Sequence, residues 1–201
     1  MLIIIFCKMR SISKRKKSFF KQVLLYSFKF VVFIFLLSLM LNLSGVENLC
    51  QNNACFVDVP FIKQEKNFCG AASLAMVFKY WGKNISQYSI ADKIYDKSKK
   101  GISSKSLKSY SEERGFLVFI YKGGLENIKE NIKKGRPLIV ALSAGAPGGF
   151  HYVVIVGYDE NLSLILVNDP YSEKLKEMKI KEFIKRWENS NYWTLLLLPK
   201  Q

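Results

Sequence analysis

The chain has 201 residues, 49% of them hydrophobic and 23% charged, so it can bury a normal core and is not disordered throughout. This length suits one domain with a short appendage. Four cysteines are too few for a small fold held together by disulfides. The one histidine, His151, excludes any metal site built from several histidines.

The net charge of +15 is unevenly distributed. Residues 1–45 contain eight basic residues and no acidic one, whereas the remaining basic residues are mixed with acids, as on a solvated surface. No DNA- or RNA-binding motif accompanies the charge, so we expect no nucleic-acid partner.

Residues 1–45 are predicted to be a signal peptide or an uncleaved signal anchor. A basic cluster at residues 14–21 precedes an apolar run at residues 30–43, whose length suits a secretory signal. The run extends to a single transmembrane segment of about residues 23–43 if Lys29 snorkels to the lipid headgroups. A membrane is therefore an expected partner of this segment.

Cleavage and orientation follow from the ends of this segment. Ser44-Gly45 provides small residues for cleavage before Val46, and either Met1 or Met9 could begin the translated chain. The positive charges ahead of the apolar run predict that the rest of the chain lies outside the cytoplasmic membrane, either anchored or secreted.

The sequence beyond residue 45 predicts an α+β domain over residues 57–201, preceded by a polar linker at 46–56. Helices are expected mainly in the first half and a mostly antiparallel sheet in the second. The predicted helices cover about residues 69–81, 87–95, 105–114, 125–134 and 180–188. The predicted strands cover about residues 56–62, 116–121, 137–142, 151–158, 162–168 and 192–198.

Cys69 and His151 are the main candidates for catalysis. Cys69 opens the first helix of the domain, where free N–H groups and the helix dipole favour a nucleophilic thiolate. His151 begins a strand directly after a glycine-rich loop, where a base can meet a nucleophile from another element. The alternatives are a small buried cysteine and a structural histidine at a strand end.

Two further side chains could complete such a site. Asp169 ends the strand that forms a hairpin with the strand of His151, so it can accept a ring N–H, with the adjacent Asn168 as the fallback. Neighbouring strand residues face opposite sides, so only one of the two should reach His151. The side chain of Gln64 could join the Cys69 N–H group as an oxyanion hole. Asp169 before Pro170 could equally be an ordinary turn residue.

These residues lie in motifs that resemble the bacteriocin-processing, double-glycine cysteine peptidase family. The motifs are Gln64-x-x-x-x-Cys69-Gly70, the helix ending Tyr80-Trp81-Gly82, His151-Tyr-Val-Val-Ile-Val-Gly157-Tyr158 and Asn168-Asp169-Pro170. The resemblance implies a papain-like fold, with Cys69 as nucleophile, His151 as general base and acid, Asp169 as its orienter and Gln64 as oxyanion donor. Ala71 stands where many members have proline, and since alanine is an excellent helix former the departure has little weight.

The resemblance predicts a cysteine peptidase that acts on exported peptides or on leader peptides, with small residues such as Gly-Gly before the scissile bond. The alternatives are a catalytically silent peptide-binding module tethered to the membrane, or a thiol amidohydrolase or acyltransferase. Members fused to exporters continue into a membrane domain and an ATPase, which this sequence lacks, so we expect no ATP binding and no cofactor, with a separate exporter as one candidate partner.

The linker cysteines leave two alternatives open. Cys50 and Cys55 enclose four residues and could form a disulfide outside the cytoplasm, or could remain two thiols. A zinc site from Cys50, Cys55, Cys69 and His151 has irregular spacing, and we expect no metal.

Overall fold

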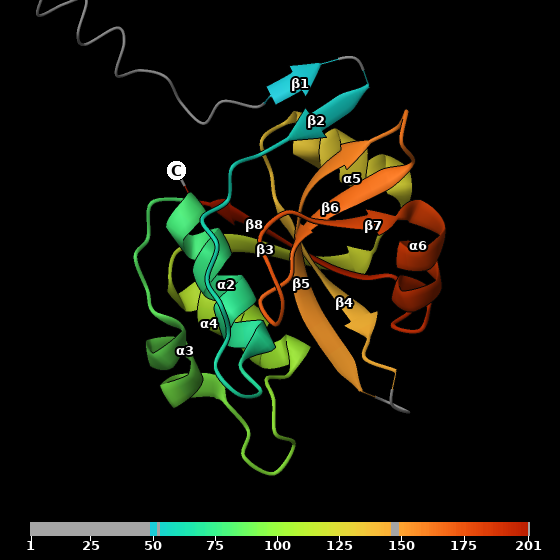
Figure 1. Cartoon of the computed structure of the whole chain (residues 1–201). Helices are drawn as coiled ribbons and strands as arrows, with labels where there is room; N and C mark the ends of the chain where they lie inside the picture. Colours follow the sequence, from blue (N-terminus) through green and yellow to red (C-terminus); the bar gives the residue numbers. More distant parts are fainter. Residues whose placement is uncertain (1–48, 52, 146–148, 201) are drawn as a thin grey trace, which may run out of the picture. The chain divides into compact units, whose positions relative to one another are not determined.

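The computed structural model describes residues 49–51, 53–145 and 149–200 (Figure 1). The predicted signal segment, residues 1–45 with its transmembrane part at 23–43, lies outside the described residues. Within the described ranges, no helix is both long enough and apolar enough to cross a membrane.

The described chain contains five helices and eight strands. The helices are α2 (Cys69–Tyr80), α3 (Gln87–Ile94), α4 (Ser104–Glu113), α5 (Leu125–Lys133) and α6 (Ile180–Glu188). The strands are β1 (Leu49–Gln51), β2 (Ala54–Phe56), β3 (Phe116–Lys122), β4 (Leu138–Ser143), β5 (Phe150–Asp159), β6 (Leu164–Asn168), β7 (Lys176–Lys179) and β8 (Trp193–Pro199). Helices α2 to α4 lie together beside the sheet (Figure 1).

The sheet is built around β5, and all its pairings are antiparallel. The first half of β5 pairs with β4, and its second half pairs with β2. β6 pairs with β5 from Val154↔Asn168 to Asp159↔Leu164, with a bulge between Ile155 and Gly157. β8 and β3 continue the sheet beyond β4, and β7 pairs with β6. The predicted hairpin of β5 and β6 is confirmed, and it brings Asn168 at the end of β6 opposite Val154 in the middle of β5.

Helix α2 is the central helix of the domain. Its residues from Gly70 to Phe78 are all buried, because the helix is apolar on every side and can only be stable inside the core. The one buried hydroxyl, on Ser73, donates a hydrogen bond to the Tyr152 carbonyl 3.2 Å away. This bond attaches the N-terminal half of α2 to the start of the strand β5.

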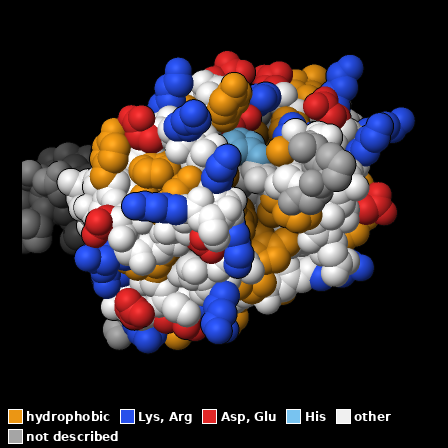
Figure 2. Space-filling model, turned by 90° about the horizontal axis from the view of Figure 1, so that it is seen from below, with side chains coloured by type: hydrophobic (Ala, Val, Ile, Leu, Met, Phe, Trp, Pro, Cys, Tyr) orange, Lys and Arg blue, Asp and Glu red, His pale blue; other side chains and the backbone are white. Residues whose placement is uncertain are grey.

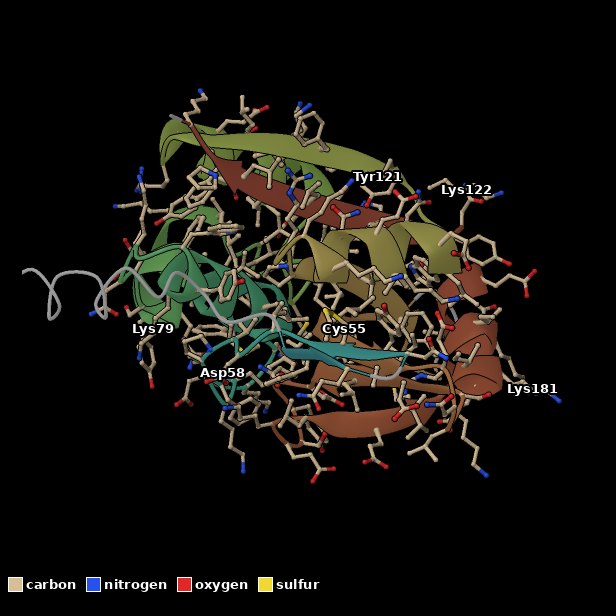
Figure 3. The ribbon with its side chains drawn as sticks, turned by 90° about the horizontal axis from the view of Figure 1, so that it is seen from above. Cys55, Asp58, Lys79, Tyr121, Lys122 and Lys181 are labelled. Atoms are coloured by element: carbon tan, nitrogen blue, oxygen red, sulfur yellow. A yellow bond between two sulfur atoms is a disulfide. The ribbon has the colours of Figure 1, made fainter. Side chains whose placement is uncertain are left out.

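The prediction that residues 46–56 form a linker is wrong for the second part of this range. β1 and β2 form a hairpin there, with Leu49 opposite Phe56, and β2 joins the sheet through β5. A disulfide joins Cys50 to Cys55, and Cys55 in β2 is buried (Figure 3). The hairpin was missed because three-residue strands are too short to show an alternating pattern.

The predicted strand at 56–62 is also wrong beyond Phe56. Val57 and Val59 are fully buried and Asp58 between them is exposed, which gives the alternation of a strand. The Val57 N–H bonds the Val156 carbonyl at 2.8 Å, but the segment forms no further ladder. The strand β7 is one that the sequence did not indicate.

Candidate active site

Cys69 is the first residue of α2, so its backbone N–H has no acceptor within the helix. It is the free cysteine of the described chain, and its side chain is partly buried. The thiol receives hydrogen bonds from the His151 side chain and from the backbone of Tyr152 and Gly70. The structure therefore brings together Cys69 and His151, which are separated by more than eighty residues in the sequence.

His151 is the second residue of β5, opposite Leu142 in β4. Its side chain is 16% exposed, and its Nε2 lies 2.6 Å from Oδ1 of Asp169. Since Asp169 occupies Nε2, Nδ1 is the ring nitrogen left for the Cys69 thiol. The ring of Tyr171 lies edge-on to the imidazole, with the ring centroids 6.4 Å apart.

Asp169, rather than Asn168, is the residue that reaches His151. Asn168 points into the core, where its Nδ2 donates to the Val59 carbonyl at 3.0 Å and its Oδ1 accepts the Leu175 N–H at 3.0 Å. Asp169 points the other way, as alternation along a strand requires. Its Oδ1 also accepts the Tyr171 N–H at 3.1 Å.

The three side chains shift one another's pKa values in the directions that a thiolate–imidazolium pair needs. Burial raises the pKa of the Cys69 thiol, but the hydrogen bond and charge of His151 outweigh it and bring the pKa below its ordinary value. Burial opposes protonation of His151, but Asp169 and Cys69 raise its pKa to about 9. Burial also opposes ionisation of Asp169, whose pKa is nevertheless held well below its usual range by His151 and Lys176. At neutral pH His151 and Asp169 are therefore charged, and the Cys69 thiol ionises more readily than an ordinary cysteine.

Gln64 lines the same cleft as Cys69 and His151. Its Oε1 is buried and has no hydrogen-bond partner among the described residues. Its backbone N–H donates to the Pro170 carbonyl at 2.8 Å, which ties the loop of Gln64 to the loop of Asp169. Gln64 and Cys69 thus border the same cleft, and the oxyanion role of Gln64 stays a prediction.

Two side chains that the sequence did not single out contact this group of residues. The buried Gln87 of α3 accepts the Glu65 N–H at 3.0 Å and donates to the Lys63 carbonyl at 2.8 Å, so it holds the backbone on both sides of Gln64. Lys176 of β7 places its Nζ 3.1 Å from Oδ2 of Asp169. Neither lies in a motif, and their role depends on contacts across loops.

The cleft over Cys69 has a volume of about 640 Å³ and is bordered by several basic side chains. Figure 2 shows the histidine in pale blue in a hollow that basic and hydrophobic side chains border. In the described ranges no group of three or more histidine, cysteine or acidic side chains could hold a metal ion. Because Cys50 and Cys55 form a disulfide, they are not available as ligands for a zinc site with Cys69 and His151.

Comparison of the sequence with known families gives a match to the Peptidase_C39 like family over residues 56–194. The chain is also 30% identical over 139 residues to the lactococcin-G-processing and transport ATP-binding protein LagD of Lactococcus lactis subsp. lactis. This alignment covers 69% of the chain but 18% of LagD, so the chain spans less than a fifth of that relative.

Solved structures share the fold. The peptidase domain of Streptococcus ComA, an ABC transporter, superposes with a TM-score of 0.59 at 21% identity, covering 71% of this chain and 98% of that domain. A double glycine motif protease from an AMS/PCAT transporter, in complex with a leader peptide, superposes with a TM-score of 0.56 at 22% identity, covering 71% and 93%. A C39-like peptidase from Bacillus anthracis gives a TM-score of 0.56 at 18% identity, covering 72% and 96%. The mixed fold of helices and an antiparallel sheet is that of C39 peptidase domains.

Proposed function

We propose, from the premise that this chain belongs to the Peptidase_C39 like family and is a cysteine-type peptidase, that it hydrolyses peptide bonds through Cys69, His151, Asp169 and Gln64. The observation that carries the proposal is the continuous chain of contacts from the Cys69 thiol through His151 to Asp169, which lies in an open cleft. A nucleophile, a base and an orienting carboxylate in this order are what acyl transfer requires.

The first half of the reaction forms an acyl-enzyme. The Cys69 thiolate attacks the carbonyl carbon of the scissile peptide bond, and the carbonyl oxygen becomes an oxyanion. In the proposed mechanism, the Cys69 N–H and the Gln64 side-chain amide donate hydrogen bonds to that oxygen. His151 then gives its Nδ1 proton to the leaving amine, the C–N bond breaks, and a thioester on Cys69 remains.

The second half resolves the thioester. His151, now neutral, takes a proton from a water molecule, and the resulting hydroxide attacks the thioester carbonyl. The C–S bond breaks, the carboxylic acid leaves, and the Cys69 thiolate and the His151 imidazolium form again. Asp169 keeps the Nε2–H of the ring directed at itself throughout, so Nδ1 always faces the sulfur.

The substrate we propose is a peptide with small residues before the scissile bond, Gly-Gly in particular. One structural relative is described as a double glycine motif protease bound to a leader peptide, and LagD is described as a processing and transport protein. Because the chain spans only part of LagD, transport is not carried over, and an exporter is proposed as a separate partner.

Paired synthetic peptides test the activity and the substrate together. One internally quenched peptide contains a single Gly-Gly, and its control has Val-Val at the same two positions. We expect cleavage after the second glycine, slower cleavage of the control by at least about tenfold, and no cleavage by Cys69→Ala. Equal rates on both peptides would remove the Gly-Gly preference, and an unchanged rate in Cys69→Ala would remove the mechanism.

We further propose that the domain acts outside the cytoplasmic membrane, because residues 1–45 carry eight basic side chains and no acid. An outward domain meets exported peptides or surface proteins rather than unexported leaders. Protease added to intact spheroplasts should degrade the domain beyond residue 46. Protection until lysis would reverse the orientation and make a Gly-Gly leader in the cytoplasm the preferred substrate.

A further inference from the structure

The Asp169 carboxylate binds two cationic partners, one on each oxygen. Its Oδ1 lies 2.6 Å from Nε2 of His151, and its Oδ2 lies 3.1 Å from Nζ of Lys176. The Asp169 side chain is 8% exposed, and the Lys176 side chain is 32% exposed. The carboxylate is therefore enclosed between the imidazole and the ammonium, with little access to water.

Lys176 is itself fixed by the strand that carries it. It is the first residue of β7, opposite Val167 of β6, which is two residues before Asp169. Its Nζ also lies 3.3 Å from the Ser172 hydroxyl in the loop between the two strands. The ammonium is thus held in place by the strand pairing of its residue and by two hydrogen bonds. A lysine side chain on a surface loop would not be fixed in this way.

We propose that Lys176 is a positioning residue of the catalytic group: it holds Oδ2 of Asp169 so that Oδ1 faces His151, and it shares the carboxylate charge with the imidazolium. The proposal rests on the function proposed above. Its consequence for catalysis is that His151 remains acidic enough to protonate the leaving amine, because an unshared carboxylate would bind the imidazolium proton more strongly.

The other groups facing His151 do not share the charge of the Asp169 carboxylate as Lys176 does. Cys69 from α2 faces the opposite ring nitrogen and favours the imidazolium. The Tyr171 ring lies edge-on to the imidazole. Arg186 of α6 borders the same cleft, but its Nε donates to the Ser143 carbonyl at 3.1 Å. Of these groups, Lys176 is the cation in contact with the Asp169 carboxylate.

The single histidine allows a direct test, because its NMR signal in the full chain needs no assignment. In Lys176→Gln, which keeps a hydrogen-bond donor but loses the charge, we expect the His151 pKa to rise by about half a unit to one unit. Lys176→Arg should leave it unchanged. Lys174→Gln is the matched control, since Lys174 lies two residues before Lys176 but pairs with Asp58 at 2.9 Å.

The outcomes separate the proposal from a merely structural role. An unchanged pKa in Lys176→Gln would show that the lysine does not share the carboxylate charge. A fall would mean that Asp169 had left the imidazole, so that Lys176 orients the carboxylate without setting the His151 pKa by sharing its charge. Either result overturns the proposal that Lys176 shares the carboxylate charge, and repeating the titration in a Cys69→Ala background, where the thiol beside His151 is absent, checks that the shift comes from Asp169.

Kinetics on the Gly-Gly peptide provide a second measurement. We expect Lys176→Gln to lower kcat about three- to tenfold with KM nearly unchanged, and Lys176→Arg to restore most of it. A loss confined to KM would contradict the proposal. If the chain cleaves no peptide at all, the proposed function fails, but the NMR titration still decides whether Lys176 acts on His151.

Discussion

Replacing Asp169 by asparagine should change which ring nitrogen of His151 carries the proton. Lys176 is an obligate donor 3.1 Å from Oδ2, so it should select the oxygen of the new amide. The amide NH₂ group then faces Nε2 and donates to it, which leaves the single ring proton on Nδ1, facing the Cys69 thiol. A neutral histidine in this tautomer cannot accept the thiol proton.

The size of the effect follows from the contact that is lost. The 2.6 Å contact joins a charged carboxylate to a buried imidazole, and such charged hydrogen bonds contribute about 1.5–3 kcal/mol, or about 10- to 150-fold in rate. The tautomer change adds to this, so we expect kcat to fall by roughly 10²–10³-fold. The His151 pKa should fall from about 9, because the upward shift from Asp169 is lost and only Cys69 then opposes the lowering by burial.

Peptide cleavage, histidine NMR and iodoacetamide alkylation measure these consequences separately. Because the imidazolium is lost, alkylation of Cys69 at about pH 6 should slow in Asp169→Asn relative to the native chain. Asp58→Asn is the control, since that exposed aspartate (Figure 3) pairs with Lys174 and neither residue lines the cleft, and it should leave all three unchanged. The reasoning is refuted if Asp169→Asn retains kcat within about threefold or leaves the His151 pKa unchanged.

Three further predictions follow from other contacts. Gln87→Leu removes the hydrogen bonds to both peptide groups beside Gln64, so kcat should fall about tenfold when this substitution is made in the native chain. The same substitution made in Gln64→Ala should lower kcat little further, and additive losses in this double-mutant cycle would contradict a role of Gln87 through Gln64. In Gly157→Ala the new methyl group would lie 2.8 Å from the Cys55 carbonyl oxygen, so thermal or urea unfolding should show that the free energy of unfolding falls by about 1–3 kcal/mol. The control Gly101→Ala, with nothing closer than 3.9 Å to its new methyl group, should be nearly neutral. Equal losses in the two variants would refute the steric argument. Reduction of the β1–β2 disulfide should raise the intact mass by about 2 Da; an unchanged mass would mean two free thiols.

Much of the fold could be predicted from the sequence, because its longer elements have strong local signals. The range predicted for α6 is the observed one, since Phe183 and Trp187 mark a buried face four residues apart. The failures were short or ambiguous segments. β7 has four residues with only Met178 buried, which gives no pattern. The alternation at Val57 and Val59 reflects burial alone, and whether a ladder partner exists is decided by the rest of the sheet.

The candidate site could be predicted for residues in local motifs but not for those that support them. Alternation along β6 allowed Asn168 or Asp169 to face His151, and the structure selects Asp169 because Asn168 is needed to bond Val59 and Leu175. The contacts of Lys176 and Gln87 depend on how loops return over 7 to 24 residues. No spacing rule in the sequence specifies such contacts.

The measurement that tests the central claim most directly is the trapping of an acyl-enzyme on Cys69. The full chain is mixed with the Gly-Gly peptide, quenched in acid within the first turnover, and analysed by intact mass and peptide mapping. The account predicts a mass increase equal to the acyl part of the peptide, located on Cys69, absent from Cys69→Ala and slow to form in His151→Ala. Product formation in Cys69→Ala at the native rate, without an adduct in either chain, would contradict it.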